Sequence, residues 1–423
     1  MRIKKLAGIL TSLACANLLL TPLEIGAESL EEAGTMSSTR YYNSCDVDRN
    51  GIVNSSDYAL LSRCLTGMSY ISDFYRLDTD CNGIVNNADL LCVKAKVAGN
   101  SFASSTDGLS SSTSQTISGS YPIISDTSTE YIKYNYKTKA TETYTLTMTP
   151  ETATVSGSTR EVIGEDNRQY LTNQSEFSGI VLLEFGIQDA AGKNSSTSVA
   201  HSTGFIVGNH QIATAAHCVY NQYSGTFERG YYFLSDTTNH KNKIYFYDKD
   251  GNQTGNYVTP IEVHIPKTYY DNHDGTDGTD YALITVEEDL SDYDCTYFSL
   301  GLVKDPYSTS FSSANIYVSG IPSVVKSEKN DDAKIAKGMG HIYSGENSYP
   351  DSMLYYTTDE TKGNSGSPIY VVTRYASSSS SSGYVTEYTA IGIVKGGNYT
   401  RNIGARITPM LQRFYLNNSY IDY

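Results

Sequence analysis

Three short motifs in the second half of the sequence contain the residue types that acyl transfer requires. They are TAAHC at residues 214–218, GTDYALITV at residues 278–286 and GNSGSP at residues 363–368. Acyl transfer needs a nucleophile, a base that accepts the proton of the nucleophile, and a carboxylate that orients the base. Ser365, His217 and Asp280 supply these groups, and they follow one another in the order His, Asp, Ser. We therefore predict that these three residues form a catalytic triad.

The glycine two positions before the nucleophile has a predicted role in the same chemistry. Gly363 allows a tight turn in which the backbone N–H groups of Gly363 and Ser365 point at the developing oxyanion. Loss of one such donor typically costs about 3 kcal/mol of transition-state stabilisation. Each motif alone has a simpler explanation as a core histidine, a turn aspartate or a glycine turn. The combination of all three in this order favours catalysis.

A second candidate site lies in a repeated segment near the N-terminus. The sequences DVDRNGIVNSSD at residues 46–57 and DTDCNGIVNNAD at residues 78–89 carry oxygen ligands at loop positions 1, 3, 5 and 12 and glycine at position 6. Calcium takes about six to eight oxygen ligands, and the glycine permits the sharp turn that aims them inward. We expect two calcium ions, with side-chain ligands and one carbonyl in each loop: Asp46, Asp48, Asn50, Asp57 and the carbonyl of Ile52; Asp78, Asp80, Asn82, Asp89 and the carbonyl of Ile84.

The chain of 423 residues divides by composition. Residues 1–27 read as a signal peptide, because basic residues precede an apolar run that is shorter than a membrane span. Residues 44–99 hold the repeat, and residues 100–161 are expected to be a Ser/Thr-rich linker or a pro-segment. In residues 162–423, short apolar and Tyr-rich runs alternate with turn residues, which favours an all-β domain. We expect a secreted, extracellular protein with no membrane contact after signal cleavage.

The net charge of the chain disfavours some classes of partner, and its cysteines limit the disulfides that it can form. The formal net charge is −15, which argues against nucleic acid or an anionic membrane surface as a partner. Six cysteines follow the expected signal peptide, at positions 45, 64, 81, 92, 218 and 295. Four of them lie in the repeat, so up to two disulfides could form there with three possible connectivities. A fully reduced state is also compatible with the sequence.

Residues 162–423 resemble the trypsin-like superfamily of serine proteases, and within it the bacterial glutamyl endopeptidases. The resemblance is carried by VIGEDNR at 162–168, IATAAHCVYNQYSGTF at 212–227, YYTTDETKGNSGSPIY at 355–370 and IGARIT at 403–408. It implies a chymotrypsin-like double β-barrel in which His217 and Asp280 come from the first barrel and Ser365 from the second. It also implies a mature N-terminus at Val162, created by a cut that would sever the preceding residues from the protease.

The resemblance weakens at the specificity pocket. Glutamyl endopeptidases carry a histidine in the strand after the nucleophile, whereas Val394 stands near that place in this sequence. Asp359 matches the place of the pocket aspartate of trypsin, and Glu360 replaces a threonine of the glutamyl endopeptidases. These acids predict a preference for cationic side chains and no strict preference for Glu. Lys395 is a nearby cation that could neutralise them or bind an acidic side chain.

The repeat in residues 44–99 resembles a dockerin, the duplicated calcium module that binds cohesin domains on cellulosome scaffolds. Each loop is followed by one apolar helical stretch, and position 12 is Asp in both copies. The resemblance implies a small all-α module and a cohesin partner. In dockerins, loop positions 10 and 11 help to choose the cohesin, and here they are Ser55-Ser56 and Asn87-Ala88. Because the two copies differ, an interchangeable dual binding mode is not expected.

The sequence therefore predicts an all-β chymotrypsin-like protease domain preceded by an all-α dockerin with two calcium loops. The expected function is that of a secreted serine endopeptidase, acting on proteins or peptides, that is anchored to a cellulosome-type scaffold. Two alternatives are a catalytically silent scaffold-associated binding module and an esterase that acts on plant cell-wall material. The complete triad with its turn glycines disfavours the silent module. Trp, which is common at sugar-binding platforms, is absent.

Overall fold

The computed structural model of the protein covers the repeat and most of the region after it. The residues that it describes are 45–48, 52–65, 71, 74–107, 128–147, 169–188, 194–220, 225, 227, 243–273, 275, 277–303, 305–307, 311, 313–322, 334–343, 352–360, 363–376, 383–397 and 401–417. The expected signal peptide, the expected cut before Val162 and the candidate calcium ligand Asn50 lie outside these residues. No helix in the described part of the chain is long and apolar enough to cross a membrane.

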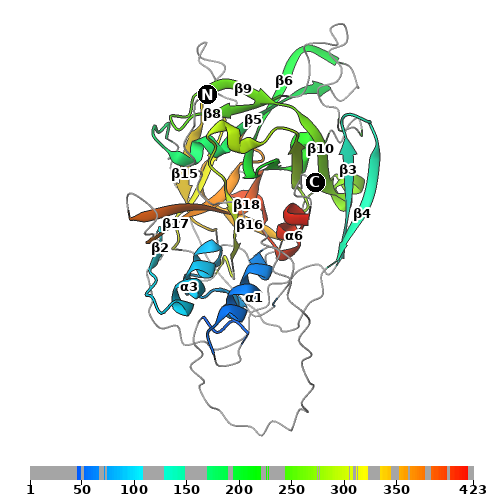
Figure 1. Ribbon diagram of the computed structural model, residues 1–423. Coiled ribbons are helices and arrows are strands. Elements are labelled where there is room, and N and C mark those ends of the chain that lie inside the picture. Colours follow the sequence, from blue (N-terminus) through cyan, green and yellow to red (C-terminus); the bar gives the residue numbers. More distant parts are fainter. Residues whose placement is uncertain are drawn as a thin grey trace, which may run out of the picture. The chain divides into compact units, whose positions relative to one another are not determined.

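The repeat folds into helices that follow its two acidic loops, as the sequence predicts (Figure 1). The first loop leads into α1 (Ser55–Leu65), and the second leads through β1 (Ile84–Val85) into α3 (Asn87–Val97); a short helix, α2 (Phe74–Leu77), lies between them. A capping box starts α3, because the Asn86 side chain accepts from the backbone at position 88 while Asp89 accepts from the backbone of Asn86. Leu61 and Val93, at matching positions of α1 and α3, are fully buried.

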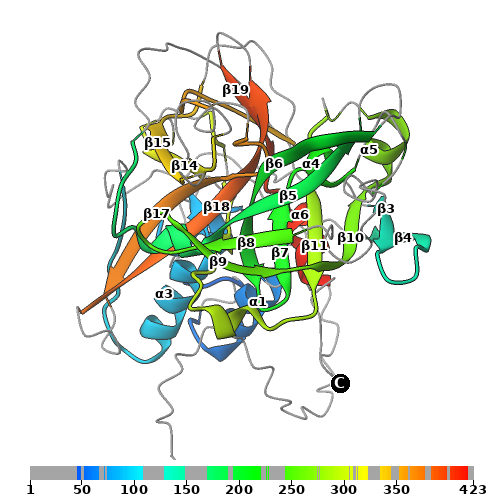
Figure 2. The same ribbon diagram turned by 90° about the horizontal axis from the view of Figure 1, so that it is seen from above.

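The remainder of the described chain is mostly β-structure in two large sheets (Figure 2). The strands of the nine-stranded sheet lie in the order β4 (Thr141–Thr147), β3 (Ser128–Asn135), β10 (Pro260–Pro266), β11 (Ala282–Val286), β7 (Gln211–Thr214), β6 (Asn194–Gly208), β5 (Ile180–Gln188), β8 (Lys243–Tyr247) and β9 (Gln253–Val258). All of its pairings are antiparallel.

The second sheet closes on itself. Its main path runs in the order β15 (Ala336–Gly340), β14 (Ile316–Gly320), β17 (Pro368–Ala376), β18 (Tyr384–Gly397), β19 (Asn402–Arg406) and β16 (Met353–Tyr356). Ile342, just after β15, forms a bridge with Tyr356 in β16, so the two ends of the path meet. Two strands pair from outside this path, β12 (Ser299–Leu300) with β18 and β2 (Ser104–Thr106) with β17. The predicted all-β class, with two large sheets and few helices, is confirmed.

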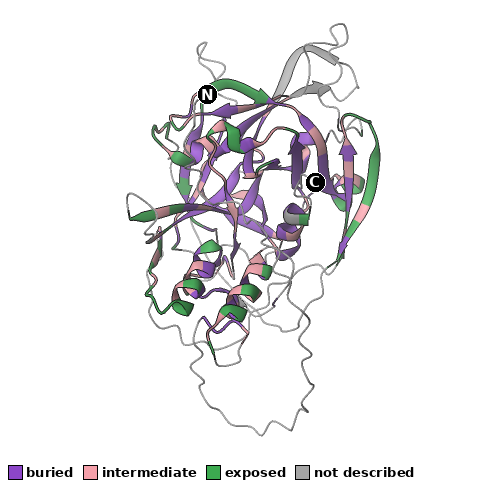
Figure 3. Cartoon of the chain, in the orientation of Figure 1, coloured by how far each residue is buried: buried purple, intermediate pink, exposed green. Residues whose placement is uncertain are grey.

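Short helices connect and cover these sheets. They are the 3-10 turns η1 (Ser175–Gly179) and η2 (Leu290–Tyr293) and the helices α4 (Ala216–Val219), α5 (Lys267–Asn272) and α6 (Pro409–Asn417). The helix α6 is tied to the first sheet, because the Tyr415 hydroxyl donates to the carbonyl of Ala282 at 2.9 Å and the Gln211 side chain donates to the carbonyl of Tyr415 at 2.8 Å. Buried residues concentrate along the strands, while β4 at the sheet edge is mostly exposed (Figure 3).

Part of the segment expected to be a linker or a pro-segment is integral to these sheets. Strands β3 and β4 form a hairpin, and β3 pairs with β10 from Glu262↔Asn135 to Pro266↔Tyr131. Strand β2 pairs with β17 over three residues. The alternation of Tyr and Ile with polar residues in β3 buries Tyr131, Ile132 and Tyr134. A flexible linker would not bury these side chains, so the high Ser and Thr content of residues 100–161 conceals structured strands.

Candidate active site and calcium loops

The candidate base and its carboxylate partner lie side by side. Strand β7 ends directly before α4, which carries His217, and β7 pairs with β11 so that Thr214 lies opposite Ala282. This register places Asp280, two residues before β11, next to the imidazole ring. His217 Nδ1 lies 2.8 Å from Asp280 Oδ2, and the backbone N–H of His217 donates to Asp280 Oδ1 at 3.0 Å. The Asp280 side chain is 2% exposed, so its two oxygens are held in a fixed position.

The candidate nucleophile sits in a turn that packs against the strands leading to His217. Gly363 and Gly366, on either side of Ser365, have φ values of 101° and 83°, which favour glycine. A Cβ on Gly366 would collide with the Thr214 hydroxyl and the carbonyl of Thr203. The sequence motif therefore needs a glycine here both for its backbone conformation and for its close approach to β6 and β7.

Thr203 in β6 makes two hydrogen bonds to backbone carbonyls of the nucleophile turn. Its backbone N–H donates to the carbonyl of Ser365 at 2.9 Å, and its hydroxyl donates to the carbonyl of Gly363 at 2.9 Å. The Thr214 hydroxyl donates to the carbonyl of Thr203 at 2.8 Å, three residues before His217. The structure thus brings the segments that carry His217, Asp280 and Ser365 together. The motifs in the sequence indicate no role for Thr203 or Thr214, since hydroxyl side chains inside strands give no distinctive sequence signal.

The electrostatics of this cluster suit a base and its orienting carboxylate. Burial alone would raise the pKa of Asp280, but the neighbouring His217 and its hydrogen bonds lower it, so this carboxyl group stays ionised. Burial alone would lower the pKa of His217, but the charge of Asp280, with a contribution from Cys218, raises it well above its ordinary value. Because an ionised carboxylate only accepts hydrogen bonds, the Nδ1 of His217 must donate to Asp280. The other ring nitrogen, Nε2, is then the atom that can accept a proton.

The predicted pocket residues lie near the nucleophile turn, in β18 and in the segment before Gly363. Val394 is fully buried, and its backbone carbonyl accepts from Gly366 at 2.8 Å while its N–H donates to Ser367 at 2.9 Å. Lys395 follows it in β18 and is half-buried; its positive charge contributes to lowering the pKa of Asp280.

The two acids expected in the pocket differ in their surroundings. Asp359 and Glu360 are both half-buried, just after β16. The Glu360 carboxylate accepts a hydrogen bond from the hydroxyl of Tyr356, a fully buried residue of β16. Burial, and then the charge of Glu360, raises the pKa of Tyr356 well above its ordinary value, so this hydroxyl remains a donor. No sequence signal indicates this role of Tyr356, because its contact depends on the turn after β16.

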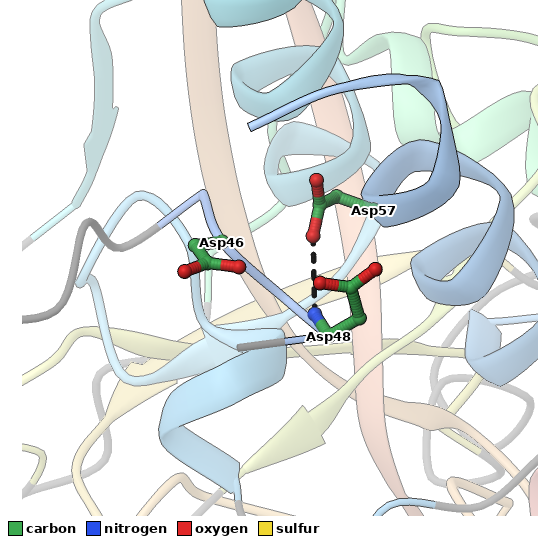
Figure 4. Close-up of side chains that lie close together, drawn as sticks. All are labelled: Asp46, Asp48 and Asp57. Carbon is green, nitrogen blue, oxygen red and sulfur yellow. Dashed lines mark hydrogen bonds between the residues drawn. The ribbon is translucent and has the colours of Figure 1, made fainter. Parts of the chain in front are cut away.

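The first acidic loop gathers three of its predicted ligands (Figure 4). Carboxylate oxygens of Asp46, Asp48 and Asp57 lie within 4.8 Å of one another. Asp57, at the start of α1, accepts from the backbone N–H of Asp48 at 3.0 Å and of Asn54 at 2.8 Å. The hydrogen bond from Asp48 thereby connects Asp57, the last residue of the loop, to the beginning of the loop.

The second loop has the same arrangement. Oxygens of Asp78, Asp80 and Asp89 also lie within 4.8 Å of one another. Gly83, at the turn position, has a φ of 84°, and its N–H donates to Asp78 Oδ2 at 2.9 Å. Burial, and then repulsion from Asp80 and Asp78, raises the pKa of Asp89 well above its ordinary value. Clustered, mutually repelling carboxylates are a suitable donor set for a hard divalent cation such as calcium.

None of the six described cysteines forms a disulfide. The closest approach is that of Cys45, directly before the first loop, and Cys92 in α3, whose Sγ atoms lie 3.6 Å apart. Cys218 is buried beside His217, and Cys295 is half-buried. Of the connectivities that the sequence allowed within the repeat, the geometry favours Cys45 with Cys92.

Two family models match parts of this chain. Residues 202–373 match the family model of the trypsin-like peptidase domain, and residues 44–98 match that of the dockerin type I domain. The chain thus contains a region similar to trypsin-like peptidase domains and a region similar to type I dockerins. A solved structure described as "Structure of Glu endopeptidase in complex with MPD" is similar, with 20% identity over 60% of this chain and 97% of that chain and a TM-score of 0.43. A search of curated proteins found no match.

Proposed function

We propose that the protein is a secreted serine endopeptidase that uses His217, Asp280 and Ser365 as its triad. The observation that carries this proposal is the hydrogen-bonded pair of His217 and buried Asp280, next to the turn of Ser365, within a trypsin-like peptidase domain. A binding module would not require a buried carboxylate to fix a histidine beside a serine turn. The proposal extends to the residue ranges expected from the sequence, with a signal peptide at 1–27 and a protease domain at 162–423.

The mechanism follows from the roles of the three side chains. Asp280 remains ionised and holds Nδ1–H of His217, which leaves Nε2 to take the proton of the Ser365 hydroxyl as its oxygen attacks the substrate carbonyl. The N–H groups of Gly363 and Ser365 would stabilise the oxyanion, and protonated His217 would then donate to the leaving amine. Water, activated by His217 in the same way, would hydrolyse the acyl-enzyme. Negative charge on Asp280 stabilises the imidazolium in both steps.

The dockerin is proposed to anchor this enzyme to a cohesin domain of a cellulosome-type scaffold. Type I dockerins generally bind calcium, and the two carboxylate clusters provide suitable ligands for one ion each. The ligands would be the residues predicted from the sequence: Asp46, Asp48, Asn50, Ile52 and Asp57; Asp78, Asp80, Asn82, Ile84 and Asp89. Bound calcium would neutralise the repulsion within each cluster and stabilise the loops that start α1 and α3.

A single assay series tests the enzymatic proposal. The purified full chain is incubated with casein and with a small ester, each with and without a serine-directed inhibitor. Inhibitor-sensitive casein cleavage is expected, and it should be absent in a Ser365→Ala protein purified in parallel. Ester hydrolysis without casein cleavage would support the esterase alternative. Absence of both activities would favour a catalytically silent module.

A further inference from the structure

The two repeats of the dockerin have the same local structure, so their surfaces can be compared position by position. Asn54 before α1 accepts from the backbone N–H of Ser56 at 2.7 Å, and Asn86 before α3 accepts from that of Ala88 at 2.8 Å. Each asparagine also donates its backbone N–H to the last aspartate of its loop, at 2.8 Å and 2.9 Å. Ile52 and Ile84 occupy the same loop position, as do Ser55 and Asn87.

The second repeat is docked onto the peptidase domain of its own chain. Its strand β1 pairs with β13 (Leu302–Val303), with Ile84 opposite Val303, and Ile84 is 0% exposed. The Asn86 side chain lies 3.1 Å from the Thr389 hydroxyl in β18. Asn87, the next residue, lies 3.1 Å from the carboxylate of Glu387 in the same strand. A strand pairing and two side-chain hydrogen bonds thus place the N-terminus of α3 on the second sheet.

The segment after α3 reinforces this contact. Ser104 in β2 donates to Asp80 of the second loop at 2.5 Å, and β2 itself pairs with β17. The hydroxyl groups of Thr106 and Thr373 lie 2.9 Å apart across that pairing and are buried. The second loop is therefore connected to β17 and β18, two neighbouring strands of one sheet.

The equivalent surface of the first repeat is exposed. Ile52 is 64% exposed, in contrast to the fully buried Ile84. Ser55 and Ser56, which begin α1, are also exposed. This isoleucine and the two hydroxyl groups at the helix start offer an apolar contact and hydrogen-bonding groups at the positions that the second repeat uses to bind a protein sheet.

We propose that the two repeats have different roles: the second binds the peptidase domain of its own chain, and the first presents the equivalent surface to the cohesin domain. This inference rests on the proposed function, because it takes a cohesin as the external partner. The expected partner surface is a sheet with an apolar site for Ile52 and with polar groups that face Ser55. The chain would bind its scaffold in one orientation only, since the peptidase domain covers the matching face of the second repeat.

Matched substitutions at equivalent positions test this division. Ile52→Ala and Ile84→Ala are made in full-length protein carrying Ser365→Ala, which prevents self-digestion, and are studied at saturating calcium. The probes are purified single cohesin domains from the scaffold proteins of the same genome, and the measurements are the Kd and the thermal unfolding midpoint. Ile52→Ala should weaken binding by at least about tenfold with an unchanged midpoint. Ile84→Ala should lower the midpoint of the peptidase domain and leave the Kd within about twofold.

A milder pair keeps the test valid if Ile84→Ala does not fold. Ser55→Ala and Asn87→Ala alter exposed side chains at equivalent positions, and only the first should weaken cohesin binding. Three outcomes would overturn the division of roles: an equal loss of cohesin affinity in both members of a pair, a loss only in the second-repeat variant, or no loss in either variant. If the unsubstituted full chain binds none of the cohesin domains, the proposed anchoring function itself fails. If the unsubstituted chain binds a cohesin domain and the Ile52→Ala and Ser55→Ala proteins bind it equally well, only the division of roles fails.

Discussion

The hydroxyl group of Tyr131 lies 3.0 Å from the hydroxyl group of Tyr281, the residue directly after Asp280. Tyr131 belongs to β3, is 0% exposed and stacks on Phe414 of α6 with ring centroids 4.4 Å apart. Tyr144 of β4 stacks on it at 5.6 Å. Residues that precede the expected cut before Val162 therefore form part of the core beside the candidate triad.

The first prediction follows from this packing: a cut between Glu161 and Val162 should not release the N-terminal part of the chain. Strand β3 would remain paired with β10, β2 with β17 and β1 with β13. After limited proteolysis at this bond, both fragments should elute together in size-exclusion chromatography and separate only in denaturant. Release under native conditions would restore the expectation that cleavage frees the protease from its dockerin.

Substitutions at Tyr131 measure how much of this association comes from its side chain. Tyr131→Ala removes a fully buried ring and should destabilise the folded protein by about 3–5 kcal/mol. Tyr131→Phe, the matched control, removes only the hydroxyl group and its bond to Tyr281, at a cost of about 1 kcal/mol. The cut Tyr131→Ala protein should be the one that dissociates most readily.

The sequence predicts the loops of this protein better than its long-range pairings. The acidic loops and the motifs around His217, Asp280 and Ser365 are local patterns, because the predicted chemistry fixes residue types at short spacings. The docking of β1 on β13 depends on residues more than two hundred positions apart, and no local periodicity encodes it. The hairpin at 128–147 was expected to be part of a linker or pro-segment because Thr is frequent in both flexible segments and exposed strands. Its buried side chains, among them Tyr131, Ile132 and Tyr134, distinguish the two, and burial is a tertiary property.

The second prediction concerns the triad. Ser365→Ala should lower kcat by at least about 10⁴-fold with no change in thermal unfolding, and His217→Ala should have a similar effect, since triad members act as a unit. Ser367→Ala is the matched control: its buried hydroxyl lies in the same turn and has no hydrogen-bond partner among the described residues. It should keep most of the activity. A Ser365→Ala protein that digests casein at the unsubstituted rate would refute the assignment.

The third prediction is a pH dependence. His217 must be neutral to accept the Ser365 proton, and Asp280 raises the pKa of His217 above its ordinary value of about 6.5. Activity should therefore rise with pH, and the midpoint of the acid limb of kcat/KM should lie above about 6.5. Asp280→Asn removes the stabilising charge, so it should move this midpoint to lower pH and reduce kcat by about 10⁴-fold. A midpoint that Asp280→Asn leaves in place would argue against His217 as the base.

The fourth prediction assigns a stabilising role to calcium in the second loop. Asp80 accepts from Ser104 of β2, so the loop that calcium would order is linked to β17 of the peptidase domain. In the Ser365→Ala background, calcium at about 100-fold excess over its Kd should add about 3 kcal/mol to the free energy of unfolding. Asp80→Asn should remove most of the calcium-dependent increase in the free energy of unfolding of the peptidase domain. The equivalent substitution in the first loop, Asp48→Asn, should reduce this increase much less. A larger reduction from Asp48→Asn than from Asp80→Asn would contradict the prediction.

The last prediction concerns the side chain that the protease accepts before the cleaved bond. Val394 cannot supply the cationic or hydrogen-bonding group that would select Glu, and Asp359 and Glu360 bring negative charge to the same region. A half-buried carboxylate that meets a substrate cation is relieved of part of its desolvation cost, so we expect cleavage after Lys or Arg to exceed cleavage after Glu. Because Asp359 matches the place of the pocket aspartate of trypsin, we assign this preference mainly to Asp359.

A digest of a peptide library by the full chain would measure this preference, with Asp359→Asn and Glu360→Gln as a matched pair. Both substitutions remove one charge and keep the shape of the side chain. Asp359→Asn should reduce the ratio of kcat/KM for cationic over neutral side chains by about tenfold, equivalent to about 1.4 kcal/mol, whereas Glu360→Gln should change it by less. Dominant cleavage after Glu by the unsubstituted protein would contradict this prediction and would leave Lys395 as the candidate cation. In that case Lys395→Gln, which removes the cation, should abolish the preference for Glu.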